Sequence, residues 1–189
     1  MCDFGSVVFL SLVWRVGKRE RKDKNVFKIV RTEALTDAIY LMDVEAPRVA
    51  KNCLPGQFVI VRGSEDGERI PLTICDYSRE AGTITIVFQV VGAATEMKNL
   101  KVGDSFTDFV GPLGRPSELV EEDLETLKNK KILFVAGGVG TAPVYPQVKW
   151  LHEHGVAADV IIGGRSKELI ILEEQMKAVA GNLYITTDD

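Results

Sequence analysis

A glycine-rich segment that follows an apolar run constrains the fold of this chain more than any other feature. The run Lys131–Ala136 has the composition of a buried strand, and Gly137-Gly138-Val139-Gly140-Thr141-Ala142-Pro143 comes directly after it. Such glycines let the backbone turn from a strand into a helix, whose first free N–H groups bind anions such as a pyrophosphate. Pro143 fits the first helical turn, where a missing N–H costs nothing. The segment therefore predicts a nucleotide site on an α/β unit.

The residues after this segment continue the alternation of strand and helix. The pattern predicts a helix through Leu151, a strand over 157–162, a helix over 172–180 and a strand over 183–186. Strands that alternate with helices indicate a parallel sheet with right-handed crossovers. Three strands are half of a doubly wound fold, so we expect a Rossmann-like α/β domain over 131–189 that is truncated at its C-terminus.

The residues before it show the period of two that is typical of strands. Six short segments rich in β-branched and aromatic residues are separated by turn signals such as Pro55-Gly56. They predict a six-stranded, antiparallel Greek-key β-barrel as a domain over 26–118. In the fifth segment Ile84, Ile86, Phe88 and Val90 form the face that we expect to be core, and Thr83, Thr85, Val87 and Gln89 form the other. The expected strands are 27–31, 38–43, 57–62, 70–76, 83–90 and 105–110.

Three segments lie outside these two patterns. A short helix capped by Thr95 is expected over 95–100, and a polar connecting helix or linker over 119–130. Residues 1–25 form an N-terminal extension whose apolar run, Val7–Trp14, is far below the roughly 20 residues that cross a bilayer. Its basic cluster follows the apolar run, which does not fit a secretory signal. We interpret the extension either as dispensable or as an added edge strand or contact segment.

Charge and cysteine content exclude several classes of protein. The net charge is −4 with scattered basic residues, so we expect no nucleic acid as partner, and the short apolar run gives no reason to expect a membrane as partner. The three cysteines, Cys2, Cys53 and Cys75, are odd in number and contain no C-x-x-C pair, so no metal site is predicted. This cysteine usage fits a reducing cytoplasm. His152 and His154 are expected at the surface or at a helix end.

A second motif precedes the glycine segment. Arg69-Ile70-Pro71-Leu72-Thr73 places a fixed cation and a hydroxyl on one predicted strand. A guanidinium matches the oxygens of a phosphate with its fork of donors. Together the two motifs suggest a flavin site followed by a site for a nicotinamide nucleotide.

The order of these motifs resembles a known superfamily. Pro55-Gly56-Gln57-Phe58, Arg69–Thr73, Gly111-Pro112-Leu113-Gly114 and the glycine segment follow one another as in the ferredoxin-NADP reductase superfamily, over residues 27 to 189. Within it, Gly67–Ile74 and Gly111–Pro116 look most like the small (alpha) subunits of NADH-dependent ferredoxin:NADP oxidoreductase, which are also called sulfide dehydrogenase beta subunits. The electron-transfer subunits of dihydroorotate dehydrogenase are near relatives of these.

The resemblance implies an FAD site on the barrel. Arg69 would pair with the pyrophosphate, Thr73 would donate to the flavin N5 edge as the catalytic residue, and Pro71 and Leu72 would pack on the isoalloxazine. Cys75 could share that face, although we expect a buried, inert thiol. The FAD-binding residues implied are Arg69, Ile70, Pro71, Leu72, Thr73, Gln89, Val90, Val91, Gly92, Ala94, Thr95, Gly111 and Pro112.

The resemblance also implies a site for NADH or NADPH on the α/β domain. Thr141 is expected to cap the helix and touch phosphate, while Pro143 replaces the third glycine of the usual motif, as this superfamily shows. Arg165 could accept a 2′-phosphate, stack on adenine or do neither, and NADH is favoured because the resembled subunits use it. The residues implied are Gly138, Val139, Gly140, Thr141, Pro143, Gly164, Arg165, Ser166 and Asp188.

The function implied is that of a flavin-dependent NAD(P)H oxidoreductase subunit. Hydride would pass from nicotinamide to FAD, and electrons would continue to an iron–sulfur centre and a larger catalytic flavoprotein or iron–sulfur subunit, with ferredoxin as a further partner. The resembled proteins carry a [2Fe-2S] cluster in a C-terminal region that has no counterpart in these residues. The alternatives are a dihydroorotate dehydrogenase electron-transfer subunit and a flavin- or nucleotide-binding module without catalysis.

Overall fold

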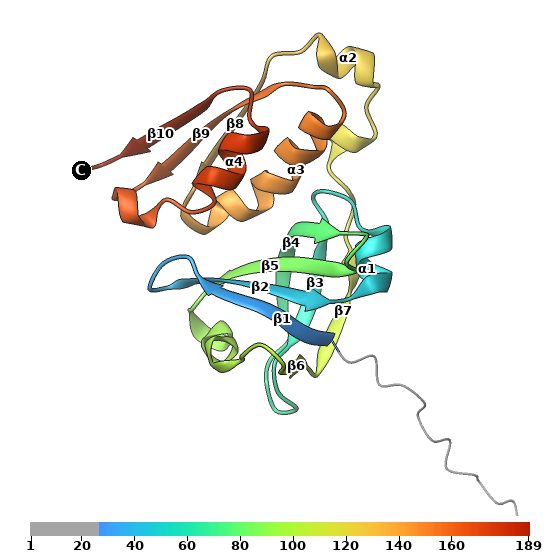
Figure 1. Ribbon diagram of the computed structural model, residues 1–189, viewed down its shortest axis with the longest axis vertical. Helices are drawn as coiled ribbons and strands as arrows, with labels where there is room; N and C mark the ends of the chain where they lie inside the picture. The colour runs from blue at the N-terminus through green and yellow to red at the C-terminus, as the bar shows by residue number, and fades with distance from the viewer. Residues whose placement is uncertain (1–26) are drawn as a thin grey trace, which may run out of the picture.

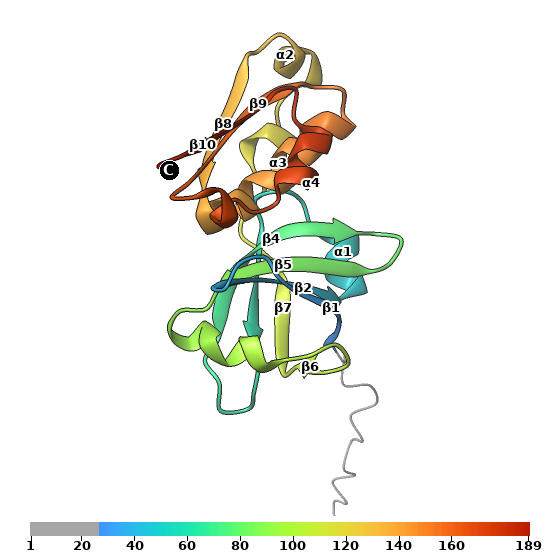
Figure 2. The same cartoon turned by 60° about the vertical axis from the view of Figure 1, so that its left-hand side comes forward.

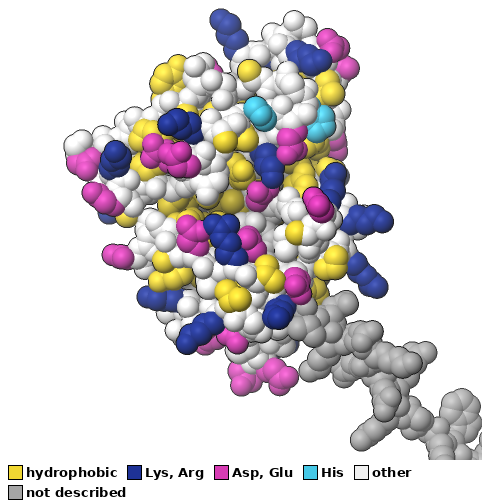
Figure 3. All heavy atoms as spheres, viewed as in Figure 1, with side chains coloured by type: hydrophobic (Ala, Val, Ile, Leu, Met, Phe, Trp, Pro, Cys, Tyr) yellow, Lys and Arg dark blue, Asp and Glu magenta, His cyan; other side chains and the backbone are white. Residues whose placement is uncertain are grey.

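The computed structural model describes residues 27–189, which form two units stacked on one another (Figures 1 and 2). One unit is an antiparallel sheet, and the other is a parallel sheet with helices on one face. Basic and acidic side chains are interspersed over both units on the face seen in Figure 3. The extension predicted over 1–25 lies outside the described residues.

Seven strands form the antiparallel sheet within the described residues, in the order β6-β1-β2-β5-β4-β3-β7. Every pairing between these neighbours is antiparallel. The antiparallel, barrel-like sheet expected from the period of two is therefore confirmed. The strands are β1 (Phe27–Ala34), β2 (Ile39–Glu45), β3 (Phe58–Arg62), β4 (Ile70–Ser78), β5 (Thr83–Gln89), β6 (Ser105–Phe106) and β7 (Asp108–Leu113).

The count of six strands is not confirmed, because the last predicted strand, 105–110, is divided at Thr107. Its first part, β6, pairs with β1, and its second part, β7, pairs with β3. The two ends of the strand order are therefore consecutive in the chain, and the N–H of Thr107 donates to the carbonyl of Arg62 at 2.9 Å. One predicted strand thus serves both edges and closes the sheet into a barrel.

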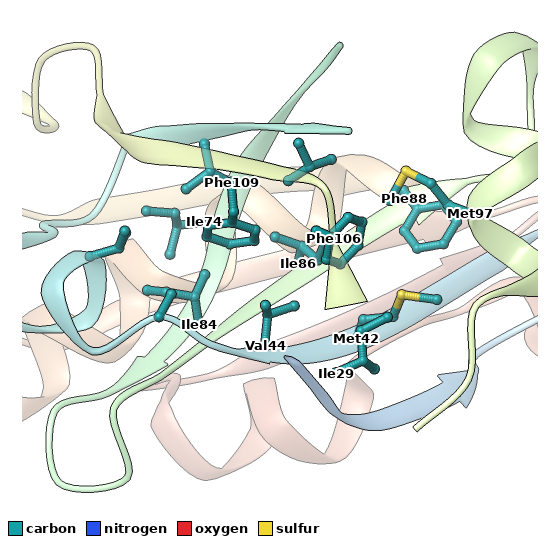
Figure 4. Packing of buried hydrophobic residues seen from close by; sticks show 14 of the residues in the cluster. Ile29, Met42, Val44, Ile74, Ile84, Ile86, Phe88, Met97, Phe106 and Phe109 are labelled. Carbon is teal, nitrogen blue, oxygen red and sulfur yellow. The ribbon is translucent and has the colours of Figure 1, made fainter. Parts of the chain in front are cut away.

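The interior of the barrel is filled by the face of β5 that the alternation predicts. Ile84 and Ile86 are fully buried and Phe88 is 2% exposed. Figure 4 shows their side chains directed toward those of neighbouring strands and of β6 and β7. Val87, on the opposite face of β5, is also buried, because the parallel unit packs against that side of the sheet. The core prediction is confirmed, and the second face is covered as well.

Two helical segments of the barrel unit differ from the sequence prediction. The helix α1 (Pro47–Asn52) was not expected, although proline at its first turn is a helix-start signal, and it buries Val49 and Ala50 against the barrel. The 3₁₀ segment η1 (Gly92–Asn99) replaces the helix expected over 95–100. Its cap is Val91, so the expected capping by Thr95 is wrong.

Three parallel strands form the second sheet of the described residues, in the order β10-β9-β8. Their existence and parallel pairing confirm the α/β expectation, whereas truncation of the sheet is not confirmed. Two helices, α3 and α4, cover one face. The elements are η2 (Glu118–Val120), α2 (Leu124–Lys128), β8 (Ile132–Gly137), η3 (Gly138–Gly140), α3 (Thr141–Glu153), β9 (Ala158–Gly164), η4 (Lys167–Leu169), α4 (Glu173–Val179) and β10 (Leu183–Thr187).

A shared apolar core joins the two units. Leu41, Cys75 and Val87 of the barrel pack in one cluster with Tyr145 and Val148 of α3. Successive residues of β4 point to opposite faces, so Ile74 is buried in the barrel core and Cys75 is buried in the shared core. The domain boundaries near 118 and 130 stay predictions.

Candidate functional site

The glycine segment forms the turn between β8 and α3. Gly138 has φ +52°, a conformation that favours glycine. No heavy atom lies within 4 Å of the position that a Cβ would take at Gly138 or Gly140, so an occupant can approach this backbone closely. The turn runs through η3 into α3, and free N–H groups at such a start attract anions. The segment therefore has the space and the donors that a pyrophosphate needs.

Thr141 does not cap α3, contrary to the prediction. The cap of α3 is Gly140, no side chain donates or accepts at the cap, and Thr141 is fully buried. Its Oγ1 has no hydrogen-bond partner among the described residues. Because the side chain is enclosed, it does not reach the surface of the turn in this conformation, and anion contacts would fall to backbone N–H groups.

A cleft of about 570 Å³ lies where the glycine segment faces the barrel. It brings together several predicted residues from both units: Gln89 of the barrel, Gly138 and Val139 of the turn, Gly164 at the end of β9 with Arg165 after it, and Asp188 after β10. This volume is within the range of pockets that hold small-molecule ligands. The remaining lining residues are Thr36, Ala38, Ile39, Gly137, Gly163, Leu169 and Thr186.

Sequence reasoning missed the barrel residues Thr36, Ala38 and Ile39 and the α/β residues Leu169 and Thr186. None of them carries a local signal of nucleotide binding. Thr186 could have been found, since it lies one residue from the carboxyl end of a parallel strand, where ligands bind in such sheets. Leu169 lies in η4, which follows β9 in the same unit, whereas Thr36, Ala38 and Ile39 come to the cleft only through the packing of the two units.

The strand β4 divides the second motif between two faces. Ile70 and Leu72 pack against the barrel core, whereas Pro71 is exposed and Thr73 is half-buried. Alternation therefore places Pro71 and Thr73 on the outer face. Leu72 does not offer its side chain to that face, so an occupant there would meet Pro71 and the hydroxyl of Thr73.

Arg69 is held at the surface by one carboxylate. Its Nη2 lies 2.8 Å from Oδ2 of Asp108, and its side chain is 62% exposed. The same oxygen lies 2.8 Å from Nε of Arg62. Since the ion pair uses one nitrogen of the Arg69 guanidinium, the others remain available to an anion. Arg69 is thus oriented by Asp108 and reachable from solvent.

The segment after β5 presents backbone rather than side chains. Gly92 has φ +57°, and no heavy atom lies within 4 Å of the position that a Cβ would take there. Val91 is 65% exposed, and Thr95 is exposed as well. Ala94 is buried in the barrel core. The start of η1 therefore has room for a ligand beside Gly92, while Ala94 can contribute only its backbone.

The remaining predicted residues lie apart from the cleft. A Cβ at Gly111 would come within 2.6 Å of Cγ1 of Val59, so close packing on β3 already explains glycine there. Pro112 follows it on β7 across a cis peptide bond, and Pro143 lies in the first turn of α3. Ser166 caps η4.

The described cysteines are not metal ligands or exposed thiols. Burial raises the pKa of Cys53 to about 11 and raises the pKa of Cys75 still more strongly. The prediction of a buried thiol at Cys75 is confirmed. Residues 27–189 contain no group of three or more His, Cys, Asp or Glu side chains that could hold a metal ion. None of their helices is long and apolar enough to span a membrane.

The two histidines lie at the end of α3, as expected. His152 is exposed, and His154 is the C-terminal cap. The His154 ring stacks on Trp150 at a centroid distance of 4.0 Å. Neither histidine belongs to the lining of the cleft.

No protein-family model matches the chain. An uncharacterized protein in the adh 3′ region of Clostridium beijerinckii is 61% identical over 165 residues, which are 87% of this chain and 56% of that protein. A dihydroorotate dehydrogenase B (NAD⁺) electron transfer subunit homolog of Thermotoga maritima is 39% identical over 162 residues, which are 85% of this chain and 55% of that protein. The chain therefore spans about half the length of these curated relatives.

Solved structures give a consistent result. The structure of an NADH-dependent reduced ferredoxin-NADP oxidoreductase, studied for flavin-based electron bifurcation, superposes with a TM-score of 0.78 and 37% identity. The match covers 88% of this chain and 58% of that one. A flavohemoglobin of Malassezia yamatoensis with bound FAD and heme, at 22% identity and a TM-score of 0.62, shares the fold.

Proposed function

This chain has the ferredoxin-NADP reductase-like fold and is homologous to electron-transfer subunits of dihydroorotate dehydrogenase B, and from that starting point we propose that it is the nucleotide- and flavin-binding part of an NAD(P)H oxidoreductase. Electrons would pass from a nicotinamide through FAD to an iron–sulfur centre and a partner subunit. The partner would be a larger catalytic flavoprotein or iron–sulfur subunit, or ferredoxin.

The cleft between the units carries this proposal. Its lining joins the glycine turn, Gly138 and Val139, to Gln89 at the end of β5. Thr73 lies on the outer face of β4, and Val87 and Gln89 lie on the outer face of β5. Because β4 pairs with β5, these three residues are on the same side of the barrel. A ring beside Thr73 and a nucleotide on the glycine turn would thus meet at Gln89.

The residues fit the two ligands in different ways. For FAD, Arg69 would hold the diphosphate, the start of η1 at Gly92 would give backbone N–H groups, and Thr73 would offer its hydroxyl to the ring. Pro71 would supply an apolar surface. When bound, FAD accepts a hydride and releases electrons singly. The chain itself needs no acid or base for this, only orientation and exclusion of water from the cleft.

For the nicotinamide nucleotide, the N–H groups of the glycine turn would bind the diphosphate. Gly164 and Arg165 would meet the adenosine ribose, where the end of the second strand lies in such sheets. We favour NADH over NADPH because the similar oxidoreductase is NADH-dependent. Arg165 is exposed and remains able to accept a 2′-phosphate or to stack on adenine.

A second candidate has its own support. Besides the Thermotoga maritima homolog, several further relatives at 30 to 33% identity are dihydroorotate dehydrogenase B electron transfer subunits. In that case the partner subunit would oxidise dihydroorotate. In either case we place the [2Fe-2S] cluster outside residues 27–189, and the whole complex in the cytoplasm.

Binding and reduction of FAD test the proposal. The purified chain should bind FAD and turn yellow, and anaerobic NADH should bleach the visible absorbance of the flavin. A protein that binds nucleotide without flavin would instead be a binding module. A protein whose melting temperature rises with none of FAD, NADH and NADPH would contradict both functions, since a ligand specific to the folded state must raise it.

Arg69→Ala sharpens the test. Loss of a charged hydrogen bond to phosphate should weaken FAD binding by roughly 10- to 100-fold. Asp108 keeps Arg62 as its partner in this variant, so no carboxylate is left unpaired. Arg79→Ala is the matched control, because Arg79 is an exposed arginine at the opposite end of β4. Equal FAD affinity in both variants would remove Arg69 from the flavin site.

A further inference from the structure

The tip of the hairpin between β1 and β2 belongs to the barrel, yet it lines the cleft of the α/β unit. Thr36 and Ala38 share the cleft with Gly164, Arg165 and Leu169. Figures 1 and 2 both show the blue tip lying beneath the orange-red segment that contains η4. The two walls of this part of the cleft therefore come from residues more than 120 positions apart in the sequence.

Hydrogen bonds hold the tip in one conformation. The N–H groups of Leu35 and Thr36 donate to the carbonyl of Ile39 at 2.9 and 3.2 Å. Oγ1 of Thr36 accepts from the N–H groups of Ala38 and Ile39 at 3.2 and 3.0 Å. The N–H of Val90 donates to the carbonyl of Ala38 at 2.7 Å, which ties the tip to the end of β5. A preorganised wall of this kind loses little entropy when a ligand binds.

The chemistry of the tip is complementary to a ribose. Thr36 Oγ1 is the acceptor in both of its bonds, so the hydroxyl proton remains to be donated. Ala38 is small and half-buried, which leaves room beside it. The facing wall is the carboxyl end of β9, where the ribose of an adenosine nucleotide lies in parallel nucleotide-binding sheets.

The geometry points to the hairpin tip as the contact of the barrel with the adenosine ribose of a bound nicotinamide dinucleotide. Thr36 donates a hydrogen bond to the ribose, and Ala38 keeps the space that the ribose fills. This inference rests on the proposed function, because it names a contact of the same nucleotide site. It adds that the nucleotide is clamped between the two units rather than bound by the α/β unit alone.

Titration calorimetry on the FAD-loaded chain tests the contact, with NAD⁺ and ADP-ribose as probes. ADP-ribose lacks the nicotinamide and so isolates the adenosine half. Thr36→Val should weaken the binding of both ligands by about 3- to 10-fold, which is the usual contribution of one hydrogen bond. Thr36→Ser, which keeps the hydroxyl, should bind within about 2-fold of the parent, as should the control Thr32→Val on β1 of the same hairpin.

Thr36→Val also removes the acceptor that orders the turn, so a second variant is needed. Ala38→Leu leaves Thr36 and the backbone hydrogen bonds in place and fills the space beside the tip. It should weaken the binding of ADP-ribose by roughly 5-fold or more. FAD affinity should be the same in all variants, because the flavin lies on the outer face of β4.

Each outcome is decisive. Parental ADP-ribose affinity in both Thr36→Val and Ala38→Leu, with FAD and NAD⁺ still bound, overturns this inference and leaves the proposed function standing. Equal weakening by Thr32→Val, or no recovery in Thr36→Ser, overturns the donor role of Thr36. A parent chain that binds neither FAD nor NAD⁺ overturns the proposed function and the inference with it.

Discussion

The barrel and the parallel sheet bury their apolar residues in different ways. The barrel closes on itself, and Ile29, Ile84 and Ile86 are fully enclosed. The parallel sheet packs one face on α3 and α4, while Val135, 68% exposed, and Tyr184, 55% exposed, lie on the other face. Parallel sheets are usually covered on both faces. Within residues 27–189, the barrel is therefore the more complete core, and the parallel sheet depends on one face and on the core that it shares with the barrel.

The largest effect is expected from Phe88→Ala. This variant removes a ring that is 2% exposed in the barrel core and should lower the free energy of unfolding by about 3–5 kcal/mol, through lost burial and the cavity left behind. Urea unfolding measures the change. The control Val91→Ala, at a side chain 65% exposed, should stay within about 0.5 kcal/mol. If both variants lower the free energy of unfolding by the same amount, burial in the barrel core does not dominate the stability of the chain.

The sequence predicted most of the barrel, because strands that bury one face in a closed core show a clear alternation of apolar residues. Alternation is a local signal, and it located the strands and the inward face of β5. The division of the last strand at Thr107 has no local signal, because it depends on which edges meet when the barrel closes. The burial of Val87 likewise depends on tertiary packing, whereas the inward direction of Leu72 follows from its alternation with Ile70 and Ile74.

The candidate site could likewise be predicted only where its residues carry a local sequence signal. Gly138, Arg165 and Asp188 were predicted from the ends of parallel strands, and they do line one cleft. Thr141 was expected to cap α3, but the turn begins earlier and encloses its side chain. Thr36 was missed because only the docking of the two units brings a barrel hairpin to the nucleotide turn.

Alkaline pH should weaken both cores through their thiols. Cys53 lies in the barrel core and Cys75 in the shared core, and burial raises the pKa of Cys53 from 9.0 to about 11 and the pKa of Cys75 in the same direction. A raised folded pKa gives stability that is full below pH 9 and is lost as the pH rises toward the folded value. The free energy of unfolding should thus fall by about 1.4 kcal/mol per pH unit for each thiol above pH 9.

Urea unfolding at pH 8, 9 and 10 under reducing conditions measures this slope. Cys53→Ala should remove the contribution of the barrel thiol to this slope. Cys75→Ala should remove the contribution of the thiol in the shared core. A slope that neither variant reduces would mean that other groups, such as the tyrosines, govern alkaline stability.

A matched pair of substitutions compares the two faces of the parallel sheet. Val160→Thr places a hydroxyl at a fully buried position of β9 and should cost about 1–3 kcal/mol if the hydroxyl finds no partner. Val135→Thr makes the same change on the exposed face of β8 and should stay within about 0.5 kcal/mol. Urea unfolding of both variants gives the difference directly. Similar costs would show that the second face is covered in solution.

The smallest effect is expected at the rim of the shared core. Nζ of Lys149 on α3 lies 2.7 Å from Oδ1 of Asp76 on β4, and both side chains are just over one quarter exposed. Water screens such a pair, so Lys149→Met should cost about 1 kcal/mol or less, and less still in 1 M salt. Lys128→Met is the control, because Lys128 pairs with Glu125 inside α2.

A double-mutant cycle with Asp76→Asn separates the ion pair from the other contacts of each residue. A coupling energy near 0.5 kcal/mol that disappears in salt would leave the apolar cluster around Tyr145 and Val148 as the main attachment between the units. A coupling of several kcal/mol would reverse that conclusion. The parallel unit would then be held to the barrel by charge at the rim rather than by the core they share.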